Sequence, residues 1–243
     1  MKAVILCAGV GSRIRPLTDD KPKPLVVVAG KTILGRMIDA SLSAGVSEFV
    51  VVTGYRAEQI KQFLTESYPG TSFTFVHNDH FEETNTGYSV LLAEPFVRGE
   101  DFIKFDGDVV FEDEVLNRLI ADKASSALCI DTRIRLEAEE VKVILDENKR
   151  VLEVGKKLDP TEAHGESIGI EKICTRVAPV FFQELHTLMQ DTTKWQEYYD
   201  DTYTTLVVRG VPMHAVDITG LKWVEIDTHE DFDRAELMFR RLT

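Results

Sequence analysis

Apolar and polar positions along the first half of the chain follow two periods. Residues 3–8 form an uncharged apolar run, typical of a strand buried on both faces of a parallel sheet. Similar or alternating runs predict strands at residues 48–53, 71–77 and 101–105. Apolar residues at helical spacing predict helices over residues 32–44, 57–67, 87–94 and 112–121. This order predicts an α/β fold with a doubly wound, mostly parallel sheet and right-handed crossovers.

The pattern changes in the second half, where predicted strands follow one another more closely. After a strand at 125–131, residues 141–145 and 151–154 predict a β-hairpin. The remaining predicted elements are strands over 167–174, 212–216 and 223–226 and helices over 176–189, 193–208 and from Thr228 onward, capped by Thr228 and Asp231. We expect a single domain over residues 1–243. A nucleotide-binding half (about 1–135) and an acceptor-binding half (about 136–243) would share one continuous sheet.

Composition narrows the class of protein. The 243 residues include 28 Lys and Arg and 41 Asp and Glu, a net charge of −13, which argues against nonspecific binding to nucleic acid. No apolar run approaches the roughly 20 residues of a membrane span, and no signal peptide is visible after Met1. Cys7, Cys129 and Cys174 lie far apart in apolar runs, which is typical of reduced core cysteines in a cytoplasmic protein. The absence of a C-x-x-C pair argues against structural zinc.

The loop after the first strand combines glycines with cations. Gly9 and Gly11 let the backbone approach a ligand closely, and successive N–H groups there can form an anion-binding concavity. Two arginines and two lysines follow between residues 13 and 23, which indicates a site for phosphates. Two familiar phosphate motifs are absent: no G-x-x-x-x-G-K-[ST] string occurs, and Ile14 takes the place of the third glycine in G-x-G-x-x-G.

This loop resembles the signature of sugar-phosphate nucleotidyltransferases, A-G-x-G-[ST]-R followed by K-P. Residues 8–13 read A-G-V-G-S-R, and residues 21–25 read K-P-K-P-L. The resemblance implies an enzyme with the Rossmann-like fold of nucleotide-diphospho-sugar transferases. It also implies two catalytic residues, Arg13 on the triphosphate tail and Lys23 between the reacting phosphates. The candidate nucleotide contacts in the loop are Cys7, Ala8, Gly9, Gly11, Ser12 and Arg13.

Two aspartates are candidates for a metal site. A nucleoside triphosphate and a phosphorylated acceptor are both anions, so catalysis needs cations and positioning more than a covalent nucleophile. Mg²⁺ prefers carboxylate oxygens and phosphates. The resemblance places metal ligands at Asp108, which follows a buried strand, and at Asp227. Asp227 could instead cap the next helix, and Glu225 on the same strand face is a weaker alternative ligand. Asp106 is either a nucleotide contact or a supporting, structural residue.

The base and the acceptor are assigned to later segments. Gly87 would let the backbone approach a ring, and Asn85 and Ser89 can form hydrogen bonds to a base, although Asn85 could equally cap the following helix. Several segments resemble the phosphocholine cytidylyltransferase-like branch, and also inositol-phosphate and 2-aminoethylphosphonate cytidylyltransferases. These are residues 85–89, 107–111, 140–143, 155–158 and 165–170. Lys156 would hold the acceptor phosphate, and Glu166 and Asp201 are further acceptor-side candidates.

We therefore expect a cytoplasmic nucleotidyltransferase that needs Mg²⁺ and transfers CMP from CTP to a small phosphorylated or phosphonated head group. Its partners are CTP and this acceptor, without nucleic acid or membrane, and a homodimer is one assembly that the sequence allows. One alternative is a sugar-1-phosphate nucleotidyltransferase that uses UTP, GTP or dTTP. Another is a catalytically inactive nucleotide-sensing subunit, against which the joint presence of Arg13, Lys23, Asp108 and Asp227 argues.

Overall fold

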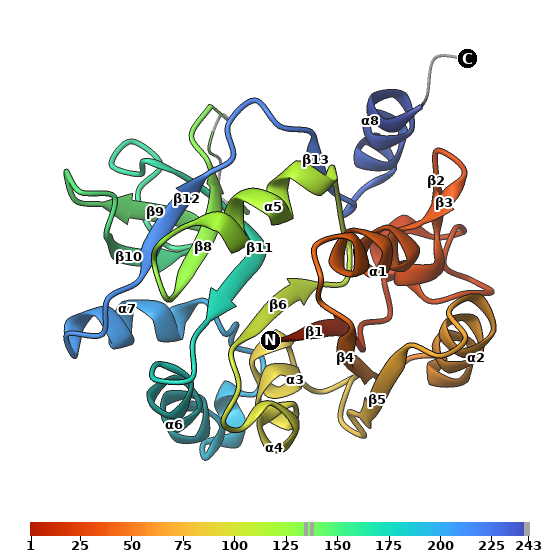
Figure 1. Cartoon of the computed structure of the whole chain (residues 1–243), viewed down its shortest axis with the longest axis horizontal. Helices are drawn as coiled ribbons and strands as arrows, with labels where there is room; N and C mark the ends of the chain where they lie inside the picture. Colours follow the sequence, from red (N-terminus) through yellow and green to blue (C-terminus); the bar gives the residue numbers. More distant parts are fainter. Residues whose placement is uncertain (134–135, 137–138, 241–243) are drawn as a thin grey trace.

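A computed structural model describes residues 1–133, 136 and 139–240 (Figure 1). Its main sheet contains β1 (Lys2–Cys7), β4 (Glu48–Thr53), β5 (Ser72–His77), β6 (Phe102–Asp106), β8 (Ala127–Asp131), β9 (Lys142–Leu145), β10 (Val151–Gly155), β11 (Gly165–Ile173) and β12 (His214–Asp217). The helices are α1 (Ile33–Ser43), α2 (Ala57–Ser67), α3 (Thr86–Leu92), α4 (Glu94–Val97), α5 (Asp113–Ala121), α6 (Ala178–Met189), α7 (Asp201–Val208) and α8 (His229–Phe239).

The centre of the sheet is parallel, as the sequence predicts. Strands β6, β1, β4 and β5 lie side by side in one direction. Strand β11 runs antiparallel to β6 and also pairs with β8 and β9, so it joins the first half of the chain to the second. The predicted hairpin is present as β9 and β10. The α/β prediction with a mostly parallel sheet is thus confirmed.

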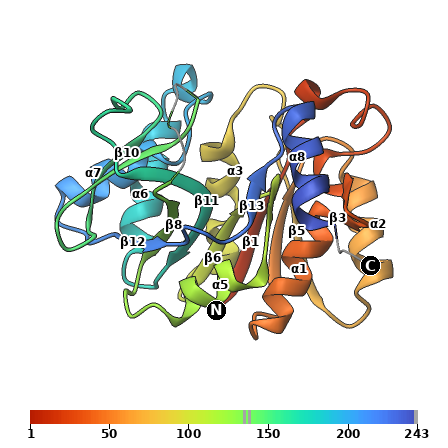
Figure 2. The ribbon, with the colours of Figure 1, turned by 90° about the horizontal axis from the view of Figure 1, so that it is seen from above.

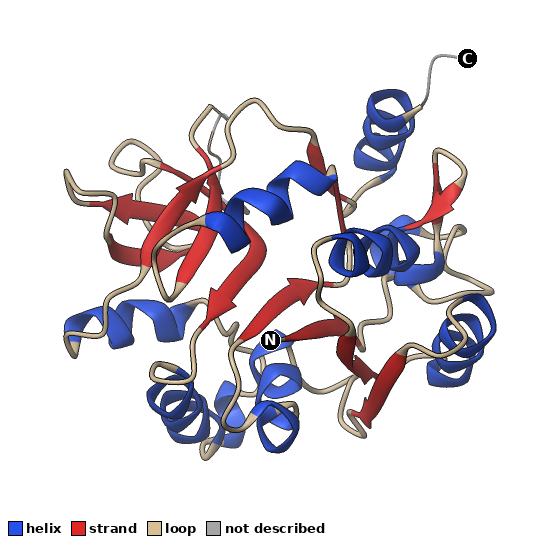
Figure 3. Cartoon of the chain, viewed as in Figure 1, coloured by secondary structure: helices blue, strands red, loops and turns tan. Residues whose placement is uncertain are grey.

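Helices cover both faces of the sheet (Figure 3). Along β1, Ala3, Ile5 and Cys7 pack in a core with α1, α2, α5 and α8. Val4 and Leu6 point the other way, into a core with α3, α4, α6 and α7. Burial of each large apolar side chain contributes roughly 1.5–3 kcal/mol, so the two cores fix the strand ends rigidly. Among the residues described, no helix is long and apolar enough to cross a membrane.

A separate pair of short strands places the end of the chain beside the sheet. Strand β7 (Val109–Phe111) pairs antiparallel with β13 (Trp223–Glu225), and the N–H of Ile226 donates to the carbonyl of Asp108. Helix α8 follows and lies against β13 and the small hairpin of β2 (Val27–Val28) and β3 (Lys31–Thr32) (Figure 2). A strand was predicted at 223–226, but its partner β7 is too short to give a periodic signal.

Two predicted helices differ from the structure. Only the second half of the helix expected over 193–208 is present, as α7 from Asp201, because a short 3₁₀ turn (Thr192–Lys194) and a loop precede it. The loop is held across the cleft because the carbonyl of Trp195 accepts from the N–H of Asn85. The helix expected over 87–94 begins at Thr86 and gives way to α4, which has Pro95 in its first turn, where the missing N–H costs no helical bond. The predicted capping box of Thr228 and Asp231 is confirmed.

Candidate active site

A cleft of about 1170 Å³ lies at the carboxyl ends of the central strands. Its walls come from the loop after β1, the ends of β6 and β11, strand β13 and the start of α8. Ligands of open α/β sheets bind at this edge. Most of the candidate residues line the cleft: Cys7, Ala8, Gly9, Gly11, Ser12, Arg13, Lys23, Asn85, Ser89, Asp106, Asp108, Lys156, Glu166 and Asp227.

The loop after β1 needs glycine for steric reasons. Gly11 has a φ of 65°, and a Cβ there would come within 2.9 Å of the Cβ of Lys23. At the end of β6, a Cβ on Gly107 would lie 2.1 Å from the carbonyl oxygen of Leu6. Both glycines therefore allow backbone segments to meet closely around the cleft. Burial and the charge of Asp108 raise the pKa of the Cys7 thiol, so Cys7 stays protonated in the cleft wall.

Lys23 bridges two carboxylates at the base of the cleft. Its Nζ lies 2.8 Å from Asp108 Oδ2 and 2.8 Å from Asp227 Oδ1, and its side chain is only 11% exposed. Burial opposes the charge of Lys23, but Asp108 and Asp227 outweigh it and raise the pKa. Arg13 Nη2 lies 2.9 Å from the same Asp227 oxygen and is 66% exposed. Burial works against the charge of Asp227, but Lys23 and Arg13 prevail and lower its pKa.

Asp108, Glu225 and Asp227 form what we call the carboxylate cluster, with one oxygen of each within 4.8 Å of the others. Burial and the charges of Asp108 and Asp227 raise the pKa of Glu225 well above its ordinary value. Hard oxygen donors crowded in this way suit a divalent cation such as Mg²⁺. The alternative of Asp227 as a helix cap is wrong, because the Thr228 side chain caps α8. Glu225, the weaker alternative, lies in the cluster beside both aspartates.

Asp106 belongs to a second charged group, which we call the buried lysine cluster. Lys104 Nζ lies 2.7 Å from Glu171 Oε2 and 3.2 Å from Asp106 Oδ1. The Tyr199 hydroxyl donates to Asp106 Oδ2 over 2.7 Å, and it also contacts the Lys104 ammonium. Gly169, with a φ of 72°, leaves room for Asp106, since a Cβ there would lie 2.3 Å from Oδ2. The sequence analysis missed this cluster, although a lysine inside the apolar run of β6 was a visible signal.

The residues assigned to the base lie on one side of the cleft, with one exception. Asn85 is the N-cap of α3, and its Oδ1 accepts from the N–H of Thr86. Ser89 Oγ accepts from Asn78 Nδ2, which orients both side chains. Gly87 does not line the cleft: a Cβ there would meet Met189 Cε at 2.6 Å and the carbonyl of Glu197 at 3.1 Å. Gly87 makes room for α6 and the loop after it, and its expected role beside a ring stays a prediction.

Lys156 and Glu166, two of the acceptor-side candidates, both line the cleft. Lys156 Nζ lies 4.5 Å from the centre of the Tyr198 ring. Glu166 is only 7% exposed, and burial together with Glu140 and Asp131 raises its pKa to about 8. The side chain of Asp201 lies outside the described residues.

Several wall residues near Glu166 escaped the sequence analysis. Asp131 ends β8, and its carboxylate accepts from Trp223 Nε1 over 2.9 Å. Glu140 lines the cleft beside it. Asp131 follows a predicted strand in the way that Asp108 does, and that position was the signal for it.

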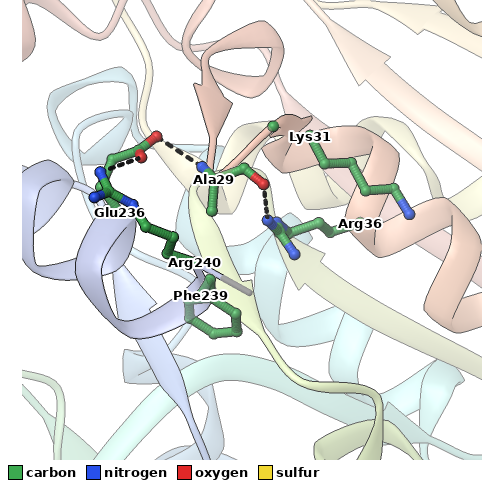
Figure 4. A pocket seen from close by; sticks show the side chains of 7 residues that line it. Ala29, Lys31, Arg36, Glu236, Phe239 and Arg240 are labelled. Carbon is green, nitrogen blue, oxygen red and sulfur yellow. Dashed lines mark hydrogen bonds and ion pairs between the residues drawn. The ribbon is translucent and has the colours of Figure 1, made fainter. Parts of the chain in front are cut away.

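A smaller pocket of about 570 Å³ lies away from the cleft, between the β2–β3 hairpin and α8 (Figure 4). Its charged groups hold these elements together: the Ala29 N–H donates to Glu236 Oε1, and Arg36 Nη2 donates to the carbonyl of Val28. The Arg36 guanidinium also stacks over the Phe239 ring. These contacts fix α8 against the β2–β3 hairpin. Because α8 begins two residues after Asp227, they also help to position the carboxylate cluster.

Comparison with known proteins agrees with this geometry. The family model for nucleotidyl transferases matches residues 2–159. A UTP–glucose-1-phosphate uridylyltransferase of Haloferax volcanii is 30% identical and covers 97% of this chain and 95% of its own. A CTP:phosphoglutamine cytidylyltransferase of Campylobacter jejuni is 29% identical over 96% of this chain and 98% of its own. The structure of the CTP:phosphocholine cytidylyltransferase of Streptococcus pneumoniae superposes with a TM-score of 0.80, 22% identity, and coverage of 98% and 99%.

Proposed function

The chain belongs to the nucleotidyl transferase family, and we propose that it transfers CMP from CTP to a small phosphorylated or phosphonated head group with a cationic end, such as phosphocholine. The observation that carries this proposal is the cleft in which Lys23, Arg13 and the carboxylate cluster face the glycine loop after β1. Such a site provides cations and metal ligands for two anionic reactants and needs no covalent nucleophile.

In the proposed reaction, an oxygen of the acceptor phosphate attacks the α-phosphorus of CTP. The bond from that phosphorus to the bridging oxygen breaks, and pyrophosphate leaves with the electron pair. The backbone of the glycine loop and Arg13 would orient the triphosphate, and Lys23 would stabilise charge on the reacting phosphates. Asp108, Asp227 and Glu225 would hold Mg²⁺, which when bound neutralises phosphate charge.

The preference for CTP is proposed from the polar groups of the base side and from the cytidylyltransferase relative. Ser89, fixed by Asn78, lies in this wall of the cleft. Cytosine carries a 4-amino donor where uracil carries a 4-oxo acceptor. A mismatched group would leave a buried polar atom unpaired, which costs about 1–3 kcal/mol or roughly 5- to 150-fold in discrimination.

A cationic end on the acceptor is proposed from the charges around Glu166. Glu166, Glu140 and Asp131 bring three carboxyl groups to this wall, with Lys142 and Arg234 near Glu166, and Tyr198 adds an aromatic face. Carboxylates and aromatic faces bind ammonium groups. An ammonium end can pair with the Glu166 carboxylate once that group is ionised, whereas a neutral hexose cannot, and this favours a choline-like or amine-bearing head group. Lys156 lies on the same side and would contact the acceptor phosphate.

A second candidate function is supported by one of the relatives. The uridylyltransferase relative spans nearly the whole chain, so a UTP–sugar-1-phosphate reaction is the second candidate. Steady-state pyrophosphate release separates the two candidates. It is measured for CTP, UTP, GTP and dTTP with phosphocholine, 2-aminoethylphosphonate, inositol 1-phosphate and glucose 1-phosphate. We expect the highest kcat/KM for CTP with a cationic acceptor, and no turnover in excess chelator. A best pair of UTP and a hexose 1-phosphate would contradict the proposal.

Glu166 gives a sharper test of the acceptor. Its pKa of about 8 means that the carboxyl group becomes anionic as the pH rises toward 8, with Glu140, Asp131, Arg234 and Lys142 as its charged neighbours. The KM for phosphocholine should therefore fall between about pH 6.5 and 8, because the carboxyl group ionises in this range and then attracts the cationic end of the acceptor. In Glu166→Gln this pH dependence should disappear, while the KM for CTP stays unchanged. An identical pH profile in both proteins would exclude Glu166 as the cation ligand.

A further inference from the structure

The Lys23 ammonium takes the place in the carboxylate cluster that a divalent cation would need. Its Nζ is 2.8 Å from an oxygen of Asp108 and 2.8 Å from an oxygen of Asp227. These residues and Glu225 present oxygens within 4.8 Å of one another. The Lys23 side chain is 11% exposed, so it reaches the cluster from inside the protein and not from solvent.

Lys23 and a divalent cation cannot both bind these oxygens well. Mg²⁺ binds carboxylate oxygens at about 2.0–2.1 Å, and the ammonium already occupies one oxygen of Asp108 and one of Asp227. An ammonium has three donors and no lone pair, so it cannot become a metal ligand itself. Two cations a few ångströms apart in a partly buried site also repel each other strongly. Cation binding is therefore opposed for as long as the ammonium stays between Asp108 and Asp227.

The attachment of Lys23 limits where its ammonium can go. Residues 23–25 form a short 3₁₀ turn after Pro22, and the Lys23 Cβ packs against Gly11 in the loop after β1. The root of the side chain is thus fixed beneath the loop that would cradle the triphosphate. When the ammonium leaves Asp108 and Asp227, the anionic partner within its reach is a phosphate bound in that loop.

We propose that Lys23 serves as an internal counterion of the carboxylate cluster in the nucleotide-free protein and that it keeps bare divalent cations out. The triphosphate draws the ammonium to its own oxygens and so opens the cluster. Cation and nucleotide then favour each other's binding, because each removes the partner that opposes the other. This inference rests on the proposed function, in that it assumes a triphosphate in the loop, but not on the identity of the base or acceptor.

Mn²⁺ titration followed by electron paramagnetic resonance tests the inference without nucleotide or acceptor. We expect Lys23→Met to bind Mn²⁺ about tenfold or more tightly than the wild type, as the loss of a nearby like charge implies. Arg13→Met is the matched control, since it removes a cation from the same Asp227 oxygen but leaves Lys23 in place. It should tighten binding by no more than about threefold, because Arg13 is solvent-exposed. Equal affinity of wild type and Lys23→Met, or equal gains in both variants, would overturn the inference.

A second measurement covers the case that Lys23→Met does not fold. In wild type, the ¹⁵N signal of the Lys23 ammonium, assigned by its loss in Lys23→Arg, should persist in excess Mg²⁺ and shift only when Mg²⁺ is added with a non-hydrolysable triphosphate. A shift with Mg²⁺ alone would overturn the inference. The Mn²⁺ titration contains no substrate, so its failure is separate from that of the proposed function, which the kcat/KM panel tests.

Discussion

The carboxylate cluster with Lys23 and the buried lysine cluster with Lys104 have similar chemical parts in different surroundings. Lys23 lies between Asp108 and Asp227, which are 25% and 24% exposed, at the floor of the cleft. Lys104 and Glu171 are 1% and 0% exposed, deep between β6 and β11. The first cluster can exchange its cation with ligands that enter the cleft. In the second, Lys104 and Glu171 are sealed from solvent, while Asp106 is 22% exposed and lines the cleft. Access to solvent thus separates the lysine that ligands can reach from the one that they cannot.

Burial also changes the protonation of the two groups. Lys104 faces Asp106 and Glu171, with Asp200 nearby, so the carboxylates outnumber the cation. Burial raises the pKa of Glu171, and Asp106 and Asp200 add to the rise against the opposing effect of Lys104. In the cleft, Asp227 has a lowered pKa and stays ionised. Each cluster therefore holds one carboxyl group with a raised pKa, Glu171 in the buried lysine cluster and Glu225 in the carboxylate cluster.

The largest expected effect is on the stability of the protein and concerns the buried lysine cluster. Lys104→Met should lower the free energy of unfolding by about 3–5 kcal/mol, because it leaves buried carboxylates without their cation. Urea denaturation followed by circular dichroism measures this. The control is Lys2→Met on β1, which breaks an ion pair with Glu100 at the surface and should cost about 1 kcal/mol or less. Equal losses in both variants would mean that the Lys104 contacts add nothing beyond a surface pair.

A substitution of Lys23 in the carboxylate cluster should change the catalytic rate. Lys23→Ala should lower kcat by about 10²-fold or more, as the loss of one preorganised charge donor does, and destabilise the fold less than Lys104→Met. Pyrophosphate release at saturating substrates gives kcat. Arg15→Ala is the control: Arg15 pairs with Asp19 and does not line the cleft, so kcat should stay near the wild-type value. An unchanged kcat in folded Lys23→Ala would remove Lys23 from the reaction.

The contributions of Glu171 and Asp227 to the free energy of unfolding should be lost at opposite ends of the pH scale. Glu171 has a raised pKa in the folded protein, so the folded state holds a proton that the unfolded state releases above its ordinary value of 4.5. Stability from this group is full below that value and falls as the pH rises through the folded pKa. Asp227, with its lowered pKa, contributes above 3.8 and loses its contribution only as the pH falls through its folded pKa.

Unfolding free energies between pH 5 and 8 check this prediction. The decline of the wild type with rising pH should be flatter in Glu171→Gln, which cannot ionise. Asp227→Asn should leave that decline unchanged and alter only the acid limb. Parallel curves for wild type and Glu171→Gln would show that Glu171 is ionised throughout.

The smallest expected effect concerns the Tyr199 hydroxyl in the buried lysine cluster. Tyr199→Phe removes the donor to Asp106 and should cost about 1–2 kcal/mol of unfolding free energy, since the acceptor is charged. Tyr203→Phe is the matched control, because its buried hydroxyl has no hydrogen-bond partner among the described residues and should be dispensable. Thermal and urea unfolding of both variants decide this. A loss in Tyr203→Phe as large as in Tyr199→Phe would mean that the bond to Asp106 is not what stabilises the fold.

The sequence predicts the fold well because its signals are local. The uncharged run of β1 and the alternation in β5 show in a few residues each. The glycine loop with Arg13 and Lys23 could be found because its parts lie within one short segment. Membership of the nucleotidyl transferase family follows from that segment and is confirmed.

The parts that sequence analysis missed depend on contacts between distant segments. Tyr199 reaches Asp106 from the other half of the chain, and residues 195–200 lie outside a helix although local periodicity favours one. Gly87 was assigned to the base because a glycine beside polar residues suggests ligand contact. Its actual neighbours, Met189 and Glu197, lie about a hundred residues away and leave no local trace.

The pairing of β7 with β13 has a consequence for synthesis on the ribosome. Strand β7 and Asp108 emerge early, together with the glycine loop, but Glu225 and Asp227 arrive only with β13. A nascent chain that has exposed β1 to β12 thus has the glycine loop but an incomplete carboxylate cluster. Lys23 then has Asp108 as a partner but not Asp227. Glu225 and Asp227 join Asp108 and Lys23 only when the three-residue strand β13 docks. The charged groups of the site are thus complete only after the rest of the fold has formed.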